Sequence, residues 1–151
     1  RHTSNSPQIL SKIMNSLTPF LKIRGKELLN QIKPNNQIEN IKTIDESLLF
    51  KSNGTDPSLL LPEIHFPKNK FSAVKIEFTV PEATQSQIFY ISDENEHFNE
   101  TNSFVLAAEK GINILTFYLP FNSSINKPLR FDPGSVNGEY EIQSVEFLES
   151  K

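Results

Sequence analysis

Alternation of apolar and polar residues with a period of two constrains this sequence more than any other feature. In residues 71–80, FSAVKIEFTV, apolar side chains occupy every second position from Val74 to Val80, and Pro81 follows the run. Successive side chains of a strand point to opposite faces, so this pattern predicts a half-buried antiparallel strand. Further runs of the same kind follow at 86–93, 103–108, 112–120, 129–132 and 139–149.

Together with earlier apolar clusters, these runs predict a mainly β fold. Leu48–Phe50 and Leu59–Leu61, together with Ile38, Ile41 and Ile44, supply at least two more short strands, which makes about eight. Polar turns rich in Gly, Pro and Asn separate the runs, and no helical pattern follows residue 40. We therefore expect a jelly-roll-like antiparallel β-sandwich.

The last run, residues 139–149, changes parity along its length. Tyr140 and Ile142 have one parity, whereas Val145 and Phe147 have the other. A β-bulge between the two pairs would keep all four side chains in the core, whereas a regular strand would turn one pair toward solvent or a covering element. We predict the bulge.

The first part of the chain has a helical period instead. Apolar residues recur at three- and four-residue spacing over 9–17, which predicts an amphipathic helix. Thr18–Pro19 has the form of an N-cap followed by proline, so it predicts a second helix that Pro34 would end. We expect one or two such helices as a linker or appendage, residues 1–37, before a sandwich module of residues 38–151.

Charge divides the chain near the same place. Residues 1–34 carry six Lys or Arg against one acid, a net charge of +5, whereas the remainder carries nine against 17, a net charge of −8. The acidic body argues against a nucleic-acid-binding face, since phosphate contacts need clustered Lys and Arg. The basic helices have two interpretations: a linker packed on another domain or on a second copy, or a peripheral contact with an anionic membrane.

The sequence contains no recognisable catalytic motif. The chain lacks cysteine, and none of His2, His65 and His97 lies in a nucleophile motif. Its five glycines form no phosphate-binding loop, and 151 residues leave no room for a nucleotide-binding α/β core beside the sandwich. The number of acidic residues does not exclude a pair of carboxylates of the kind that glycosidases use. We expect no enzymatic activity, no catalytic residue and no cofactor.

The loop DENEHFNET, residues 93–101, is the densest polar cluster of the chain. His97 and Phe98 offer an aromatic platform for a sugar ring. No metal site is expected here, because the spacing does not match an EF-hand loop, and the loop's acids are weak calcium candidates only. These acids are Asp93, Glu94 and Glu96. The alternative is an ordinary solvated hairpin loop.

Two further pairs of residues are candidates for ligand contact. Tyr90 and Tyr118 have the opposite parity to their apolar neighbours, so they are expected on outer faces as a glycan platform or as packing at the core edge. Arg130 and Asp132 are separated by one residue and share the outer face of their strand, where Arg130 can reach the carboxylate or a ligand hydroxyl. The alternative for this pair is a salt-bridged corner that fixes strand register.

Five phrases, in this order, resemble a known bacterial module. They are NGTDPSLLLPEI (53–64), AVKIEF (73–78), SQIFYISDENEHFNETNSF (86–104), GINILTFYLP (111–120) and LRFDPGSVNGEYEIQSVEF (129–147). The module is a non-catalytic β-sandwich attached to bacterial glycosyltransferases and other surface-polysaccharide proteins, and it is similar to galactose-binding-like and carbohydrate-binding sandwiches.

The resemblance implies an accessory role in polysaccharide biosynthesis. The implied partners are a glycan acceptor and other domains of a parent protein, and the implied location is cytoplasmic, with peripheral contact to the inner membrane through the basic helices as a further option. Because the chain begins at Arg1 without Met, we expect it to be part of a larger protein. The alternative function is a structural or interaction module that arranges domains, oligomers or membrane position and binds no sugar.

Overall fold

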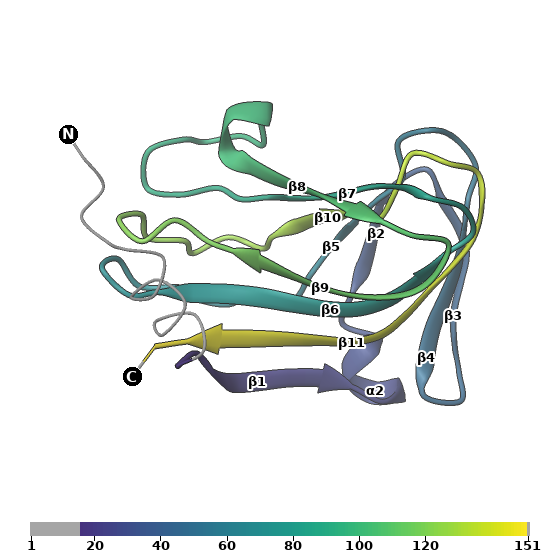
Figure 1. Ribbon diagram of the computed structural model, residues 1–151, viewed down its shortest axis with the longest axis horizontal. Helices are drawn as coiled ribbons and strands as arrows, with labels where there is room; N and C mark the ends of the chain where they lie inside the picture. The colour runs from purple at the N-terminus through teal and green to yellow at the C-terminus, as the bar shows by residue number, and fades with distance from the viewer. Residues whose placement is uncertain (1–15, 151) are drawn as a thin grey trace.

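The computed structural model describes residues 16–150, which form two antiparallel sheets packed face to face (Figure 1). Sheet A consists of β1 (Thr18–Arg24), β3 (Ile38–Ile44), β4 (Ser47–Ser52), β6 (Ser72–Val80), β9 (Gly111–Tyr118) and β11 (Gly138–Glu149). Sheet B consists of β2 (Lys33–Asn36), β5 (Ser58–Leu60), β7 (Thr84–Phe89), β8 (Ser103–Ala108) and β10 (Arg130–Asp132). The described residues also include the helix α2 (Lys26–Leu29) and the 3-10 helix η1 (Glu100–Asn102).

The order of strands is β3-β4-β11-β6-β9 in sheet A and β2-β5-β10-β7-β8 in sheet B. In sheet A, β4 pairs with the first half of β11 and β1 with its second half, on the edge opposite to β6. The expected antiparallel β-sandwich is therefore confirmed. The described residues form eleven strands instead of about eight, because β1 and β2 were not expected and the apolar clusters of residues 38–61 form three strands.

The predicted second helix, from Thr18–Pro19 to Pro34, is wrong. Residues 18–24 form strand β1, in which Leu21 and Ile23 face the core, and Gly25 ends the strand with a φ of +83°. The helical spacing depended on apolar residues over the whole segment, namely Phe20, Leu21, Leu28, Leu29 and Ile32. Within residues 18–24, Leu21 and Ile23 have the period of two of a strand, and the edge of β11 offers the backbone partners that this strand needs.

The N-terminal segment therefore belongs in part to the sandwich. Since β1 lies in sheet A and β2 in sheet B, the two sheets begin before residue 38. The helix predicted over residues 9–17 lies largely outside the described residues. Residues 18–24, which were expected to continue the basic helical surface, form strand β1 instead. Within residues 16–150, no helix is long and apolar enough to cross a membrane.

Phenylalanine rings join the two sheets in the core. The ring of Phe131 on β10 lies 5.1 Å from that of Phe78 on β6 and 6.4 Å from that of Phe117 on β9, with edge-to-face geometry in both pairs. All three side chains are buried. This contact of β10 with β6 and β9 of sheet A fixes the position of the outward side chains on β10.

The predicted β-bulge in the last strand is confirmed. The register between β11 and β6 shifts between Ile142 and Ser144. Tyr140, Ile142, Val145 and Phe147 are all buried in the core, although their parities differ. One extra residue therefore keeps both halves of β11 facing inward.

The turn after β10 is tied to β7 by hydrogen bonds. The buried hydroxyl of Ser86 donates to the carbonyl of Pro133 over 2.7 Å, and the hydroxyl of Tyr140 donates to the carbonyl of Val136 over 2.7 Å. A Cβ atom at Gly134 would lie 2.7 Å from both the methyl group of Thr84 and the hydroxyl of Tyr140. Only glycine therefore fits at position 134 without displacing Thr84 or Tyr140.

Replacing Gly134 by alanine is expected to lower the free energy of unfolding by about 2 kcal/mol, because Thr84 and the hydrogen-bonded Tyr140 hydroxyl must both move. Urea unfolding followed by circular dichroism measures the loss. The matched control is Ser135→Ala at the next, exposed position, which keeps the backbone N–H that donates to Thr84 and is expected to cost less than about 0.5 kcal/mol. Equal stability of the two variants would contradict the packing argument.

Candidate functional site

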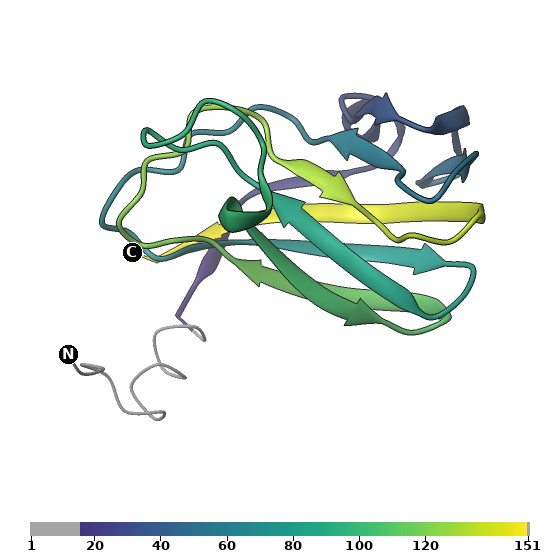
Figure 2. The same cartoon turned by 90° about the horizontal axis from the view of Figure 1, so that it is seen from above.

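The outward face of sheet B carries charged, amide and aromatic side chains in contact around one strand, β10. This short strand lies between β5 and β7 in the middle of the sheet, which Figure 2 shows from above. Phe131 points into the core, so its neighbours Arg130 and Asp132 point outward. The parity argument from the sequence therefore holds for both residues.

Arg130 and Asp132 form a bidentate ion pair. The Nε atom of Arg130 donates to Oδ1 of Asp132 and the Nη2 atom donates to Oδ2, each over 2.8 Å. The two side chains are only 20% and 12% exposed. Two parallel charge-assisted bonds fix both the plane of the guanidinium and the orientation of the carboxylate.

Two aromatic rings lie beside the guanidinium. The Cζ atom of Arg130 lies 4.0 Å from the ring centroid of Phe89 on β7 and 5.7 Å from that of Phe98 in the polar loop. The rings of Phe89 and Phe98 lie 6.4 Å apart in edge-to-face geometry. The cation–π contact and the ion pair together hold the side chain of Arg130 in one position, so the N–H groups that do not bond to Asp132 have fixed directions.

An amide and a second carboxylate continue this surface toward β8. Gln87 lies opposite Asp132 in the β7–β10 register. Its Nε2 atom lies within hydrogen-bonding distance of Ser103 Oγ, at 2.9 Å, and of a carboxylate oxygen of Glu100, at 3.2 Å. The face therefore offers donors and acceptors in a row from β10 to β8.

Burial and pairing act in opposite directions on the pKa values of Arg130 and Asp132. Burial raises the pKa of Asp132 above its ordinary value, and the nearby carboxylates of Asp56 and Glu100 raise it further, although Arg130 acts in the opposite direction. The bond to Asp132 raises the pKa of Arg130. The raised pKa of Asp132 means that burial outweighs pairing for the carboxylate, whereas the raised pKa of Arg130 means that pairing outweighs burial for the guanidinium. A largely buried charged pair with opposing effects of this kind is a candidate for function.

The structure brings Phe98, Arg130 and Asp132 together and leaves Tyr90 and Tyr118 elsewhere. The expectation that Tyr90 faces outward is wrong, because its ring is buried and stacks on Phe104 at 5.8 Å. Tyr118 is exposed, but it lies on β9 in the other sheet.

His97 is exposed in the polar loop, where its carbonyl accepts from the side-chain amides of Asn95 and Asn99. Sequence reasoning did not single out Gln87 and Phe89, because the apolar run of residues 88–91 does not show which parity faces the core. The aromatic contact to the guanidinium therefore comes from Phe89 and Phe98 and not from the tyrosines.

The polar loop gives no support to a calcium site. Asp93 pairs with Lys68 over 3.2 Å, and the hydrogen bond from Lys68 lowers the pKa of this carboxyl. In the described part of the chain, no three His, Asp or Glu side chains, Glu94 and Glu96 included, are grouped to hold a metal ion. A hollow of about 250 Å³ lies beside the loop, lined by Ile91, Ser92, Asp93, Asn95, Glu96, Asn126 and Lys127.

Comparison with known proteins places the chain by its fold. No protein-family model and no curated protein sequence matches it. Among solved structures, it is similar to the second N-terminal cellulose-binding domain of β-1,4-glucanase C from Cellulomonas fimi, with a TM-score of 0.59, 11% identity and coverage of 90% of this chain and 97% of that domain.

Two other solved structures show the same sandwich. A low-affinity xylan-binding module from Roseburia intestinalis matches with a TM-score of 0.55 and 13% identity over 87% of this chain and 95% of that one. A chain of the Glycosylation Associate Protein (Gap123) complex from Streptococcus agalactiae matches with a TM-score of 0.55 and 15% identity over 99% of this chain but only 30% of that one. At these identities the likeness establishes the fold, a β-sandwich of the carbohydrate-binding-module type.

Proposed function

We propose that this chain is a non-catalytic glycan-binding module and that a saccharide binds on the outward face of sheet B. The observation that carries the proposal is the Arg130–Asp132 pair in the middle of that face, with the guanidinium against the buried ring of Phe89 and near the half-buried ring of Phe98. Sugar hydroxyls bond to guanidinium, carboxylate and amide groups, and the apolar face of a sugar ring packs on aromatic carbon. The fold shared with cellulose-binding and xylan-binding modules supports this assignment.

The proposal extends to the setting of the module. We infer a cytoplasmic accessory role beside a glycosyltransferase or another polysaccharide-biosynthesis enzyme, in which the module holds the acceptor glycan near chemistry done elsewhere. This part rests on the resemblance of the five sequence phrases to the bacterial module.

NMR titration of the isotope-labelled full chain tests the proposal, with cellohexaose and xylohexaose as probes at millimolar concentration. We expect shifts of the amide resonances of Gln87, Phe89 and Arg130. In Arg130→Ala the affinity is expected to fall at least about tenfold, since charge-assisted hydrogen bonds are each worth roughly 1.5–3 kcal/mol. Tyr118→Ala, on the opposite sheet, is the matched control and is expected to bind as the unmodified chain does.

Three outcomes would reject a glycan site on this face: no shift with either sugar or with the polysaccharide of the source organism, shifts confined to sheet A, or equal binding by both variants. The first outcome would favour a second candidate, a structural module within a larger assembly. This alternative is supported by the match to a segment that is 30% of a longer chain in a glycosylation-associated complex.

A further inference from the structure

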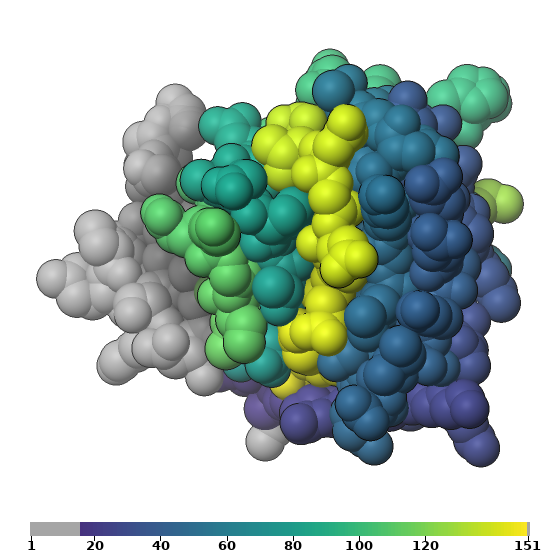
Figure 3. Space-filling model, turned by 90° about the vertical axis from the view of Figure 1, so that its right-hand side faces the viewer, coloured from purple at the N-terminus to yellow at the C-terminus, as the bar shows by residue number. Residues whose placement is uncertain are grey.

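Strand β9 lies at one margin of sheet A and is unusually regular. All eight of its residues, from Gly111 to Tyr118, pair with β6 in continuous register without a bulge. Among residues 16–150, β6 is its only pairing partner. In Figure 3, green residues of this region lie at the margin of the sheet, beyond β6 in teal and β11 in yellow.

The alternation of hydrogen-bonded residues along β9 shows which of its backbone N–H and C=O groups point away from β6. Just beyond the strand, the N–H of Leu119 donates to the carbonyl of Ser72 in the same register. Hydrogen-bonded residues alternate along an antiparallel strand, so the odd-numbered residues of β9 bond to β6. The N–H and C=O groups of the even-numbered residues therefore point to the open edge. These residues are Ile112, Ile114, Thr116 and Tyr118.

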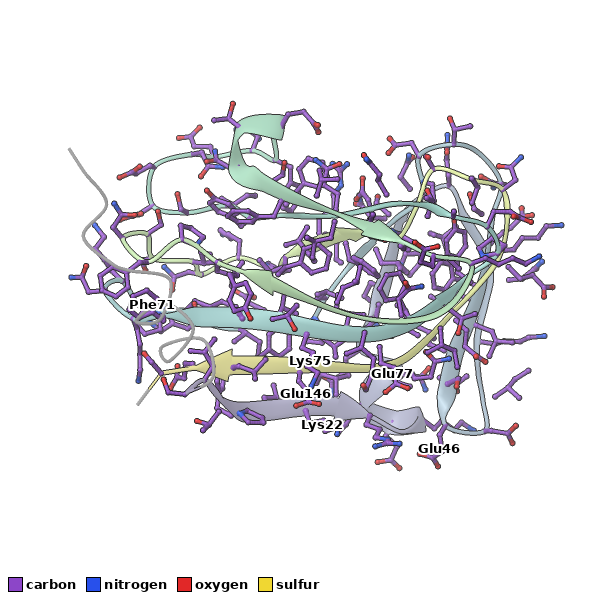
Figure 4. All side chains as sticks on the ribbon, viewed as in Figure 1. Lys22, Glu46, Phe71, Lys75, Glu77 and Glu146 are labelled. Carbon is purple, nitrogen blue, oxygen red and sulfur yellow. The ribbon has the colours of Figure 1, made fainter. Side chains whose placement is uncertain are left out.

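The same four residues point their side chains outward, and three of them are large and apolar. Ile112, Ile114 and Tyr118 are 67%, 58% and 41% exposed. We call these four residues the β9 stripe. The neighbouring outward surface of sheet A is different in character, because Lys22, Glu146 and Lys75 follow one another across β1, β11 and β6 (Figure 4). The stripe is thus an apolar margin on a charged face.

The β9 edge also lacks the usual protection against strand pairing. Sheet edges are normally blunted by charged residues, proline or bulges. Of the strands at the other three ends of the two sheets, β3 carries Glu39 and Lys42 on either side of a register shift, and β2 carries Lys33 and Pro34. The third, β8, is also uncharged and regular, but it is shorter than β9 and has one exposed large apolar side chain, that of Val105. Strand β9 has no charge, no proline and no bulge.

We propose that β9 pairs with β9 of a second copy of this chain, which joins the two A sheets into one continuous antiparallel sheet. Charge favours this occupant: the strand is neutral over its whole length, so a two-fold arrangement brings no like charges together along it. A strand edge that offers alternating donors and acceptors is also complementary to its own antiparallel copy.

The alternation of hydrogen-bonded residues along β9 limits the registers in which two copies of β9 can pair. If the two-fold axis passes beside Leu115, each even-numbered residue faces an even-numbered residue of the second copy, and all four residues of the β9 stripe bond across the interface. Ile112 then lies opposite Tyr118 of the second copy, and Ile114 lies opposite Thr116. Pairs of β-branched and aromatic residues are among the favourable cross-strand pairs. A contact built mainly on one strand is smaller than a standard interface, which is typical of weak, transient association.

Sedimentation velocity of the full chain over a range from about 1 to 500 µM, wide enough to bracket a micromolar dissociation constant, tests the proposal. We expect a shift from monomer to dimer with rising concentration. In Ile114→Lys the dimer is lost, because a charge is placed on the edge. In Ile114→Pro it is also lost, because a free-edge donor is removed, while the bonds between β9 and β6 stay intact since this N–H points away from β6. The matched control is Val105→Lys on β8, which also replaces an exposed β-branched residue of an uncharged edge strand and is expected to leave the dimer unchanged.

Hydrogen exchange measured by NMR checks the register itself. The amides of Ile112, Ile114, Thr116 and Tyr118 are expected to gain protection as the concentration rises, whereas the odd-numbered amides of β9 stay protected throughout. The proposal is overturned if the chain is a monomer at every concentration, if the dimer persists in both folded Ile114 variants, or if Val105→Lys dissociates it equally. Circular dichroism establishes that each variant is folded.

Discussion

Replacing Phe131 by alanine is expected to lower the free energy of unfolding by about 3 to 5 kcal/mol. The side chain is fully buried, and its ring contacts Phe78 and Phe117 of the opposite sheet. Truncation would remove the aromatic contact that joins β10 to sheet A and leave a cavity between the sheets. A loss of this size is a large fraction of the roughly 5–15 kcal/mol that stabilises a typical domain.

Urea unfolding followed by far-ultraviolet circular dichroism measures this effect. Phe121→Ala is the matched control, since it removes the same side chain at a position that is 41% exposed and packs mainly on Phe71. We expect the control to lose about 1 kcal/mol or less. Equal losses in the two variants would show that the two sheets are not held together by the ring of Phe131.

The strands after residue 44 could be predicted from sequence because burial there follows a simple period. Each strand has one face in the core, so apolar residues mark alternate positions, and the change of parity in β11 predicted the bulge between Ile142 and Ser144. The pattern also predicted that Phe131 faces inward and that Arg130 and Asp132 face outward. These are local consequences of the alternation of side chains along one strand.

Strand β1 could not be predicted in this way, because its conformation depends on a distant segment. Thr18 pairs with Glu149 and Arg24 with Ser144, so the partner of β1 lies at the other end of the chain. Without that partner, the spacing of Phe20, Leu21, Leu28, Leu29 and Ile32 favours a helix, and only Leu21 and Ile23 have the spacing of a strand. Tertiary pairing overrode the local preference.

The site shows the same division between local and distant information. Parity indicates that Phe89 and Tyr90 point to opposite faces, but it does not say which of them faces the core. The register between β7 and β10 decides this question by placing Phe89 beside Arg130. Half of the site, the Arg130–Asp132 pair, was therefore predictable, whereas the aromatic and amide groups beside it depend on strand order.

Replacing Arg130 by glutamine is expected to destabilise the fold by about 3 kcal/mol at neutral pH, because it leaves the carboxylate of Asp132 largely buried without its cation. The double variant Arg130→Gln/Asp132→Asn is expected to recover most of that loss, since no buried charge remains. The matched control is Lys22→Gln, which breaks the more exposed pair of Lys22 with Glu146 and is expected to cost less than about 1 kcal/mol. Chemical unfolding of the four proteins measures these differences, and a double variant as unstable as Arg130→Gln would contradict the argument.

The pH dependence of these proteins separates the cost of burial from the benefit of pairing. The folded pKa of Asp132 is raised above its unfolded value of about 3.9, so the folded state binds the proton more tightly than the unfolded state does. The contribution of Asp132 to stability is therefore fully present below the unfolded pKa and is lost as the pH rises through the folded pKa. Asp132→Asn is expected to remove this decline.

In Arg130→Gln the decline is expected to become larger and to extend to higher pH, because the group that lowers the pKa of Asp132 is gone. Unfolding free energies measured from pH 3 to pH 8 for these variants test the sign directly. A rise in the stability of the unmodified chain relative to Asp132→Asn across this range would mean that pairing outweighs burial and that the pair stabilises the fold. A fall would mean that the burial of the carboxylate costs more than its pairing with Arg130 contributes, as the raised pKa of Asp132 predicts.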